Sequence, residues 1–404
     1  MKKTLYQRYT SLLFVSSMSL LASTSANAKT VYEAVSSGDV YADFYLRYEG
    51  VSQDNALQDA DALTLRTRLG YVSDSLNGWS FQVELEDSRI VGGQGDYSVP
   101  PTGYNTGIYS VIADPETTEL DQGFVQYKND GFTFKVGRQV IALDGHRHVG
   151  HVGWRQDRQT FDAATFIYNP NDKLKASYSY LTQRNRIFAE ERDLDSKDHL
   201  LNISYQSGIG KLVAYSYLLE VDNETDNALD TFGFSIDGKK AMDSLSWLYY
   251  FEYASQRSEL SGNEFDADFI DAKLGLAYQG VTVKLSYESL GSDDGQYGFA
   301  FPLSTLHKFN GWADLFLATP AEGLVDTNVT VSTQALGGKW LARYHTYEAD
   351  EASETVDDLG SEINLQYTTK IFKDYGLGIK YANYSGDSNR PDTDKLWIWL
   401  TTKF

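Results

Sequence analysis

The sequence predicts an all-β fold: a transmembrane, up-and-down antiparallel β-barrel of about eighteen strands. Three observations predict it. Apolar and polar residues alternate over segments of roughly ten residues, the pattern of a membrane-spanning strand. Along the chain, the connections between these segments alternate between short turns and long loops. After residue 28, no stretch approaches the roughly 18 apolar residues that a membrane helix needs.

Residues 1–28 have the pattern of a secretory signal peptide. Three basic residues precede an uncharged, mainly apolar segment at 12–22, and Ala26-Asn27-Ala28 supplies a small-x-small cleavage pattern. The apolar segment is too short to cross a bilayer as a helix. We therefore expect cleavage of the signal peptide and a single barrel domain over residues 29–404. The chain has no Cys, which excludes a lipoprotein attachment site and a disulfide framework.

The predicted strands account for most of the remaining chain. Their number is even, as in single-chain bacterial barrels. In order they are 38–50, 62–72, 79–88, 120–128, 132–141, 160–168, 174–182, 199–206, 211–220, 231–237, 244–255, 268–279, 281–290, 323–333, 339–349, 359–368, 375–385 and 394–404.

The connections set the expected orientation of the barrel. Even-numbered strands are followed by short turns such as 129–131 and 169–173. Most odd-numbered strands are followed by longer connections, which include 89–119, 142–159, 183–198 and 291–322. Short periplasmic turns alternating with long external loops are typical of a barrel with both termini in the periplasm.

Proline and aromatic residues agree with this plan. All 7 prolines lie in the connections, where no hydrogen bond of a strand ladder is lost. Many tyrosines and tryptophans lie near strand ends, as residues of the two interfacial girdles do, although aromatic residues also favour strands in general. The girdle candidates are Tyr48, Tyr71, Trp79, Tyr127, Tyr168, Tyr278 and Tyr367.

The last predicted strand carries a further signal. Leu396, Ile398, Leu400, Thr402 and Phe404 share one parity and would face one side of the sheet. A strand with this pattern and a terminal aromatic residue resembles the terminal strand of bacterial outer-membrane barrels. The resemblance implies the outer membrane of a Gram-negative bacterium, with lipid and lipopolysaccharide around the barrel.

The strand number leads to a function. A barrel of this size is too wide for its own side chains to fill and encloses an aqueous channel unless loops plug it. The formal net charge of −21 argues against nucleic acid as a partner, because phosphate binding needs a basic surface. The parity opposite to the apolar rows would place charged residues in the lumen. These are Arg47, Arg66, Arg68, Glu84, Glu86 and Lys135, with Lys175, Lys273, Lys284, Glu288, Glu362 and Lys380.

The segment 137–158 is unusual because it combines four arginines and three histidines with glycines. Such a loop suits inward folding, where its donors would meet an anionic solute. His146, His148 and His151 could also hold zinc, but no Cys is available and no carboxylate is fixed beside them by the sequence. The sequence leaves this metal question open and otherwise predicts no catalytic residues and no cofactor.

Two motifs resemble one known family. GRQVIALDGHRHVGHVGWRQDRQTFDA (137–163) and TLHKFNGWADLFLATPAEGLVD (305–326) are similar to sequences of the alginate-export family of outer-membrane porins. The resemblance implies an eighteen-strand monomeric barrel and assigns conduit roles to Arg138, Arg147, Arg155 and Arg158. It also implies export of an alginate-like polysaccharide as an alternative function.

The sequence thus predicts a porin for passive diffusion of small hydrophilic solutes, anionic or saccharide in nature. A barrel phospholipase or protease is a further alternative, but His199 and its neighbour Asn202 lack a Ser-centred constellation. A gated receptor would need an N-terminal plug domain, for which residues 29–37 are too short.

Overall fold

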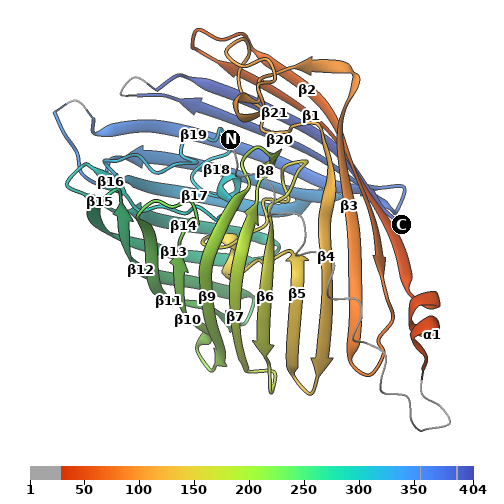
Figure 1. Ribbon diagram of the computed structural model, residues 1–404. Helices are drawn as coiled ribbons and strands as arrows, with labels where there is room; N and C mark the ends of the chain where they lie inside the picture. Colours follow the sequence, from red (N-terminus) through yellow and green to blue (C-terminus); the bar gives the residue numbers. More distant parts are fainter. Residues whose placement is uncertain (1–28, 355, 388–389) are drawn as a thin grey trace, which may run out of the picture.

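The computed structural model describes residues 29–354, 356–387 and 390–404, so the predicted signal peptide lies outside the described residues. Eighteen strands form one antiparallel sheet in which consecutive barrel strands pair with each other. The last, β21 (Thr393–Lys403), pairs with the first, β1 (Asp39–Gln53), and this pairing closes the barrel (Figure 1). Closure leaves no sheet edge without hydrogen-bond partners, as a strand structure in lipid requires.

The other barrel strands are β2 (Ala60–Val72), β3 (Trp79–Asp96), β4 (Thr117–Asn129), β5 (Phe132–Gln139), β6 (Thr160–Tyr168), β7 (Leu174–Asn185), β9 (Leu194–Ser207), β10 (Gly210–Leu219), β11 (Asn227–Met242), β12 (Leu245–Leu260), β13 (Asn263–Tyr278), β14 (Val281–Leu290), β17 (Leu324–Ala335), β18 (Gly338–Glu348), β19 (Asp358–Ile371) and β20 (Tyr375–Ser385). Outside the barrel sheet lie α1 (Val31–Ser36), β8 (Ile187–Glu190), β15 (Ser292–Asp293), β16 (Tyr297–Gly298) and the 3-10 turns η1 (Pro100–Thr102), η2 (Asp144–His146) and η3 (Leu306–Lys308). None of the described helices is long and apolar enough to span a membrane.

All the predicted strands are present, and the prediction of an eighteen-strand barrel is confirmed. Several strands are longer than predicted. For example, β12 and β13 continue until only Ser261-Gly262 joins them, where the sequence predicts a connection over 256–267. In the β12 extension, Gln256 and Ser258 are buried inside, where Gln256 donates to the Ala300 carbonyl at 2.9 Å, and Arg257 is exposed outside. Residues 255–259 are thus polar on both faces, so no apolar alternation reveals this extension in the sequence.

The outer face of the barrel is apolar. On β21, Leu396 and Ile398 are 38% and 42% exposed, whereas Trp397 between them is fully buried in the interior. Trp79 lies beside Tyr127, with ring centroids 5.1 Å apart, at the ends of strands that adjoin short turns. Trp340 and Tyr367 form a similar pair at 4.6 Å. Half-polar rings at this level fit an interfacial girdle at the short-turn end.

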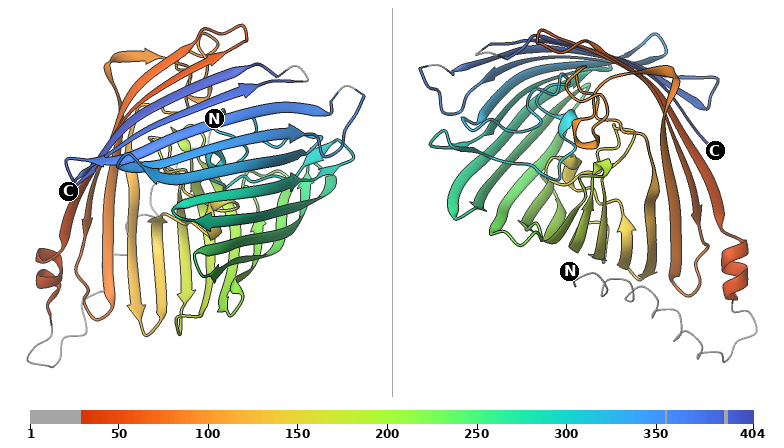
Figure 2. Two further views of the ribbon diagram at one scale, coloured as in Figure 1. Left: turned by 180° about the vertical axis from the view of Figure 1, so that it is seen from behind. Right: turned by 45° about the horizontal axis from the view of Figure 1, so that its top comes forward.

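The long connections do not all remain outside. Loop 140–159 and loop 291–323 leave the same end of the barrel and run inside the ring of strands (Figure 2). They meet there as a small parallel bridge between Val149 and Leu303, and the Gly150 amide donates to the Leu303 carbonyl at 2.8 Å. The lumen is therefore narrowed by two loops that also hold each other.

Candidate solute pathway

Arg155 fixes loop 140–159 to the barrel wall. Its Nη1 lies 2.9 Å from Oε2 of Glu49 on β1, and its Nη2 lies 3.1 Å from Oδ2 of Asp314 in the other loop. All three side chains are almost completely buried. The pair of carboxylates raises the pKa of Arg155 against the effect of its burial. One guanidinium thus joins the wall and both loops.

The three wall arginines on β1 and β2 lie together, as the sequence predicts, but each has an acidic partner. Arg47 pairs with Asp114, Arg66 lies 3.1 Å from Asp43, and Arg68 pairs with Glu86. Arg47 also donates to the Trp154 carbonyl, which adds a link between wall and loop. In the loop, Arg158 pairs with Glu84 and Asp121. These residues act first as ties, because their charges are compensated at short range.

Two sequence-predicted residues lie apart from this cluster. Lys135 faces inward on β5, with its Nζ 4.1 Å from the centre of the Phe124 ring. Arg138 does not face the lumen, which corrects the expectation for this residue. It shares the parity of Val136, which is exposed on the outer face, and it pairs with Asp162 at 2.8 Å. Strand parity decides this, since a conduit role would need the opposite face.

Loop 291–323 contacts the wall close to the same place, on β20, which is separated from β1 by β21. The His307 ring stacks on Trp154 with centroids 4.9 Å apart, and its Nε2 lies 3.0 Å from Nζ of Lys380 on β20. Its Nδ1 lies 2.6 Å from Asp314. Burial lowers the pKa of His307 to about 3, so the ring is neutral, with Nδ1–H donating to Asp314 and Nε2 accepting from Lys380.

Two cavities lie on either side of the loops. The first, of about 540 Å³, is lined by inward-facing residues of β10–β14, β17 and β18 near the short-turn end, such as Lys211 and Lys339. The second, of about 410 Å³, is lined by loop residues at the other end, such as Arg186 and Ala318. Arg147 and Asn310 line both cavities, and both side chains are buried. The two cavities therefore adjoin at these two residues.

Arg147 is held on several sides. Its Nε lies 2.8 Å from Oε1 of Glu288 on β14, and its Nη2 donates to Oδ1 of Asn310 at 3.0 Å. Its guanidinium also lies 3.8 Å from the centre of the Phe301 ring, a cation–π contact. Asn310 in turn donates to Glu288 at 2.7 Å. This group lies where the linings of the two cavities share residues.

The larger cavity carries four cations without a carboxylate of the described chain at salt-bridge distance, although acidic residues such as Asp237 and Asp326 also line it. Lys284 on β14, Lys308 in η3, and Lys339 and Arg343 on β18 line it, and within the described residues none has an ion-pair partner at salt-bridge distance. Arg343 instead donates to the Thr330 hydroxyl at 2.8 Å. Burial and the charges of Lys273 and Arg343 lower the pKa of Lys308, which reflects a local excess of positive charge.

The three loop histidines do not converge on one point. His148 Nε2 lies 3.2 Å from Glu252 and 2.8 Å from the Tyr215 hydroxyl. His151 contacts the His146 ring instead, and burial lowers its pKa to about 4. Among the described residues, metal-ligand spacing is found in a different group, Glu86, Glu119 and Asp157.

Sequence reasoning did not select Asn310, Lys308 or Arg343. Asn310 and Lys308 lie in the second family motif, which carried no residue assignments of its own. Arg343 has the inward parity of a predicted strand and could have been included by the same rule that selected Lys284.

One family model matches this chain. The family model for alginate export matches residues 36–287, more than half of the chain. The chain belongs to the alginate-export family. No curated protein matches this member of the family.

Solved structures agree with its barrel. Acinetobacter baumannii OccAB1 is similar with a TM-score of 0.73 and 13% identity, covering 92% of this chain and 97% of that one. Pseudomonas aeruginosa OccK9 (OpdG) has a TM-score of 0.71 at 13% identity, with 92% and 99% coverage. Pseudomonas aeruginosa OpdK, solved with vanillate, has a TM-score of 0.69 at 10% identity, with 91% and 98% coverage. At these identities the similarity shows a shared outer-membrane barrel fold.

Proposed function

We propose that this member of the alginate-export family is an outer-membrane channel for passive diffusion of small hydrophilic solutes, with a preference for anions. The observation that carries the proposal is the pair of cavities that meet at Arg147 and Asn310. The larger one presents Lys284, Lys339 and Arg343 without acidic partners. Fixed cations beside a narrow passage lower the energy of an anion there and raise that of a cation.

The inward loops favour small solutes over a polysaccharide chain. Loop 140–159 and loop 291–323 are pinned to the wall by buried ion pairs such as Arg155–Glu49 and Lys395–Asp314. A polymer needs one continuous wide path, whereas the two cavities here are each of the size that holds a small molecule. The vanillate bound to the similar OpdK is a small aromatic carboxylate, which supports this solute class.

A channel needs no catalytic residues. The candidate pair for the enzyme alternative, His199 and Asn202, does not form a common site. His199 is exposed on the outer face and contacts the Tyr178 hydroxyl at 2.8 Å. Asn202 faces the interior and contacts Tyr217 at 3.0 Å. The two side chains lie on opposite faces of β9, so they cannot share one site. We further propose that the barrel is monomeric and that its apolar outer face contacts lipid and lipopolysaccharide.

The test is transport by purified protein. In planar bilayers we expect discrete conductance steps and a reversal potential that shows anion preference. In liposome-swelling assays we expect small carboxylates to enter faster than uncharged disaccharides. Absence of conductance, or equal rates for a long uronic-acid oligomer and a monomeric acid, would overturn the proposal in favour of polymer export or another role.

A further inference from the structure

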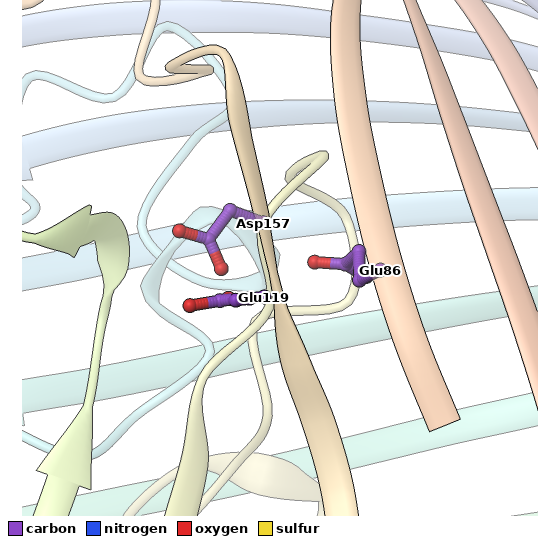
Figure 3. A group of neighbouring side chains, drawn as sticks. All are labelled: Glu86, Glu119 and Asp157. Atoms are coloured by element: carbon purple, nitrogen blue, oxygen red, sulfur yellow. The ribbon is translucent and has the colours of Figure 1, made fainter. Parts of the chain in front are cut away.

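Three carboxylates from different parts of the chain meet beside the loop. Glu86 comes from β3, Glu119 from β4 and Asp157 from loop 140–159, and they face a common space (Figure 3). Each offers one oxygen to a group in which all these oxygens lie within 4.8 Å of one another. Loop and wall residues thus meet in one cluster.

Asp157 points to a missing partner. Its side chain is completely buried, and its Oδ2 accepts from the Ala189 amide at 2.9 Å. Its Oδ1 is also buried and has no hydrogen-bond partner. A buried carboxylate oxygen without a donor or cation is destabilising, because it has lost its water without gaining a partner.

The charge balance around the cluster points the same way. The local carboxylates are five: the cluster itself with Glu84 and Asp121. The guanidinium groups that pair with them are three, those of Arg66, Arg68 and Arg158. This leaves a formal excess of two negative charges in a buried region. Either protons or a bound cation must compensate it.

We propose that Glu86, Glu119 and Asp157 bind one divalent cation, Ca²⁺. The donors are carboxylate oxygens alone, which suit a hard cation and not zinc or copper. Ca²⁺ accepts irregular geometry and completes its shell with water, so three carboxylates at this spacing suffice. The competing state is a proton on Asp157 that is donated to Glu119; a cation differs from it because it joins Glu86 to the other two carboxylates as well.

The site would act on the loop. Asp157 lies between Gln156 and Arg158, next to the ion pairs of Arg155 with Glu49 and of Arg158 with Asp121. A cation shared with Glu86 and Glu119 ties this corner of loop 140–159 to β3 and β4. The inference is independent of the solute, because it concerns only how the loop is held.

The experiment uses the full mature barrel refolded in detergent free of lipopolysaccharide, which itself binds divalent cations. Calorimetric titration with Ca²⁺ should show one site per barrel with a dissociation constant below about 1 mM, the weak end for extracellular calcium sites. Asp157→Asn and Glu119→Gln should each weaken binding at least tenfold. Asp222→Asn, in the exposed loop between β10 and β11, is the matched control and should bind as the wild type does.

A second readout keeps the test decisive if a variant does not fold. In wild-type protein, Ca²⁺ should raise the melting temperature relative to EGTA, and the shift should disappear in Glu119→Gln. Absence of saturable Ca²⁺ binding by the wild type, or equal affinity in wild type and both variants, would overturn the site. In that case protons compensate the cluster.

Discussion

Nε of Arg147 lies 2.8 Å from Oε1 of Glu288, and this contact joins the inner loop to β14 at the point where the two cavities meet. Both side chains are buried. Each charge compensates the other, so removal of either one changes the field in the passage as well as its width. The contact therefore links the packing of the loop to conduction.

Arg147→Gln should open the passage and weaken anion preference. The shorter side chain removes bulk beside Asn310, and Glu288 keeps a negative charge without its partner. We expect single-channel conductance to rise about twofold and the anion-to-cation permeability ratio to fall severalfold, both measured in planar bilayers.

The matched control for this variant is Lys197→Gln. Lys197 is exposed and pairs with Asp222 at 2.9 Å outside the passage. The Lys197→Gln substitution removes the same charge as Arg147→Gln and should leave the conductance unchanged. If Arg147→Gln conducts as the wild type does, the solute path does not pass this residue.

Arg155→Met should destabilise the docked loops. Glu49 would remain buried and unpaired with Arg155, although Arg47 still lies 3.2 Å from it, and Asp314 would keep Lys395 at 3.0 Å. Breaking one partner of a buried pair costs about 3–5 kcal/mol. The measurement is urea-induced unfolding followed by tryptophan fluorescence, which senses Trp154 beside the loop.

Arg257→Met is the comparison for that loss. Arg257 pairs with Glu264 on the surface, where both side chains are more than half exposed. Such pairs contribute at most about 1 kcal/mol. Equal stability of the two variants would show that Arg155 is not a tie.

Acid should loosen the loops through His307. Burial holds its pKa at about 3, below the ordinary value near 6.5, so the native state favours the neutral ring. The unfolded chain binds a proton first as pH falls, and this stabilisation is present above pH 6.5 and lost progressively toward pH 3. We expect the melting temperature to fall between pH 7 and pH 4.5, and to fall less in His307→Gln. An equal fall in both proteins would assign the acid sensitivity to other groups.

The sequence was sufficient for the barrel because membrane strands are governed by parity. Leu396 and Ile398 must face lipid, so Trp397 and Lys395 between them must face inward, and no tertiary information is needed. The same rule placed Arg47, Arg66 and Arg68 on one inner sector.

The solute path could not be predicted in this way. Arg147 contacts Asn310, which lies 163 residues away in the sequence. This contact depends on how the two loops dock within the lumen. The sequence also predicts that an arginine is charged, but it does not predict which carboxylate pairs with it. The wall arginines are ties, and the cavity cations without a salt-bridge partner among the described residues are Lys284, Lys308, Lys339 and Arg343.

The orientation of the barrel can be tested by single-cysteine labelling, since the chain has no native Cys. Glu224→Cys lies in the exposed connection between β10 and β11, and Leu336→Cys lies in the short turn between β17 and β18. A membrane-impermeant maleimide should label the first on intact cells and the second only after the envelope is permeabilised. The reverse labelling pattern would show that the barrel has the opposite orientation in the membrane.

Ion selectivity gives the sharpest prediction, because two charge arguments oppose each other. The net charge of −21 favours a cation-preferring pore. However, charges beyond a Debye length of about 8–10 Å are largely screened, and many acids lie in outer connections such as 222–226. Lys284 and Arg343, which have no carboxylate at salt-bridge distance among the described residues, line the cavity itself. We therefore expect the wild-type pore to prefer anions at moderate salt.

Reversal potentials under a salt gradient measure this preference directly. The double variant Lys284→Glu, Arg343→Glu should change the sign of the reversal potential, because it replaces two cations of the cavity with two anions. Lys175→Glu, which shares the inward parity but does not line the cavity, should shift the potential much less. A wild-type pore that already prefers cations, and that the double variant leaves unchanged, would show that the solute path avoids this cavity and that the outer acids set its selectivity.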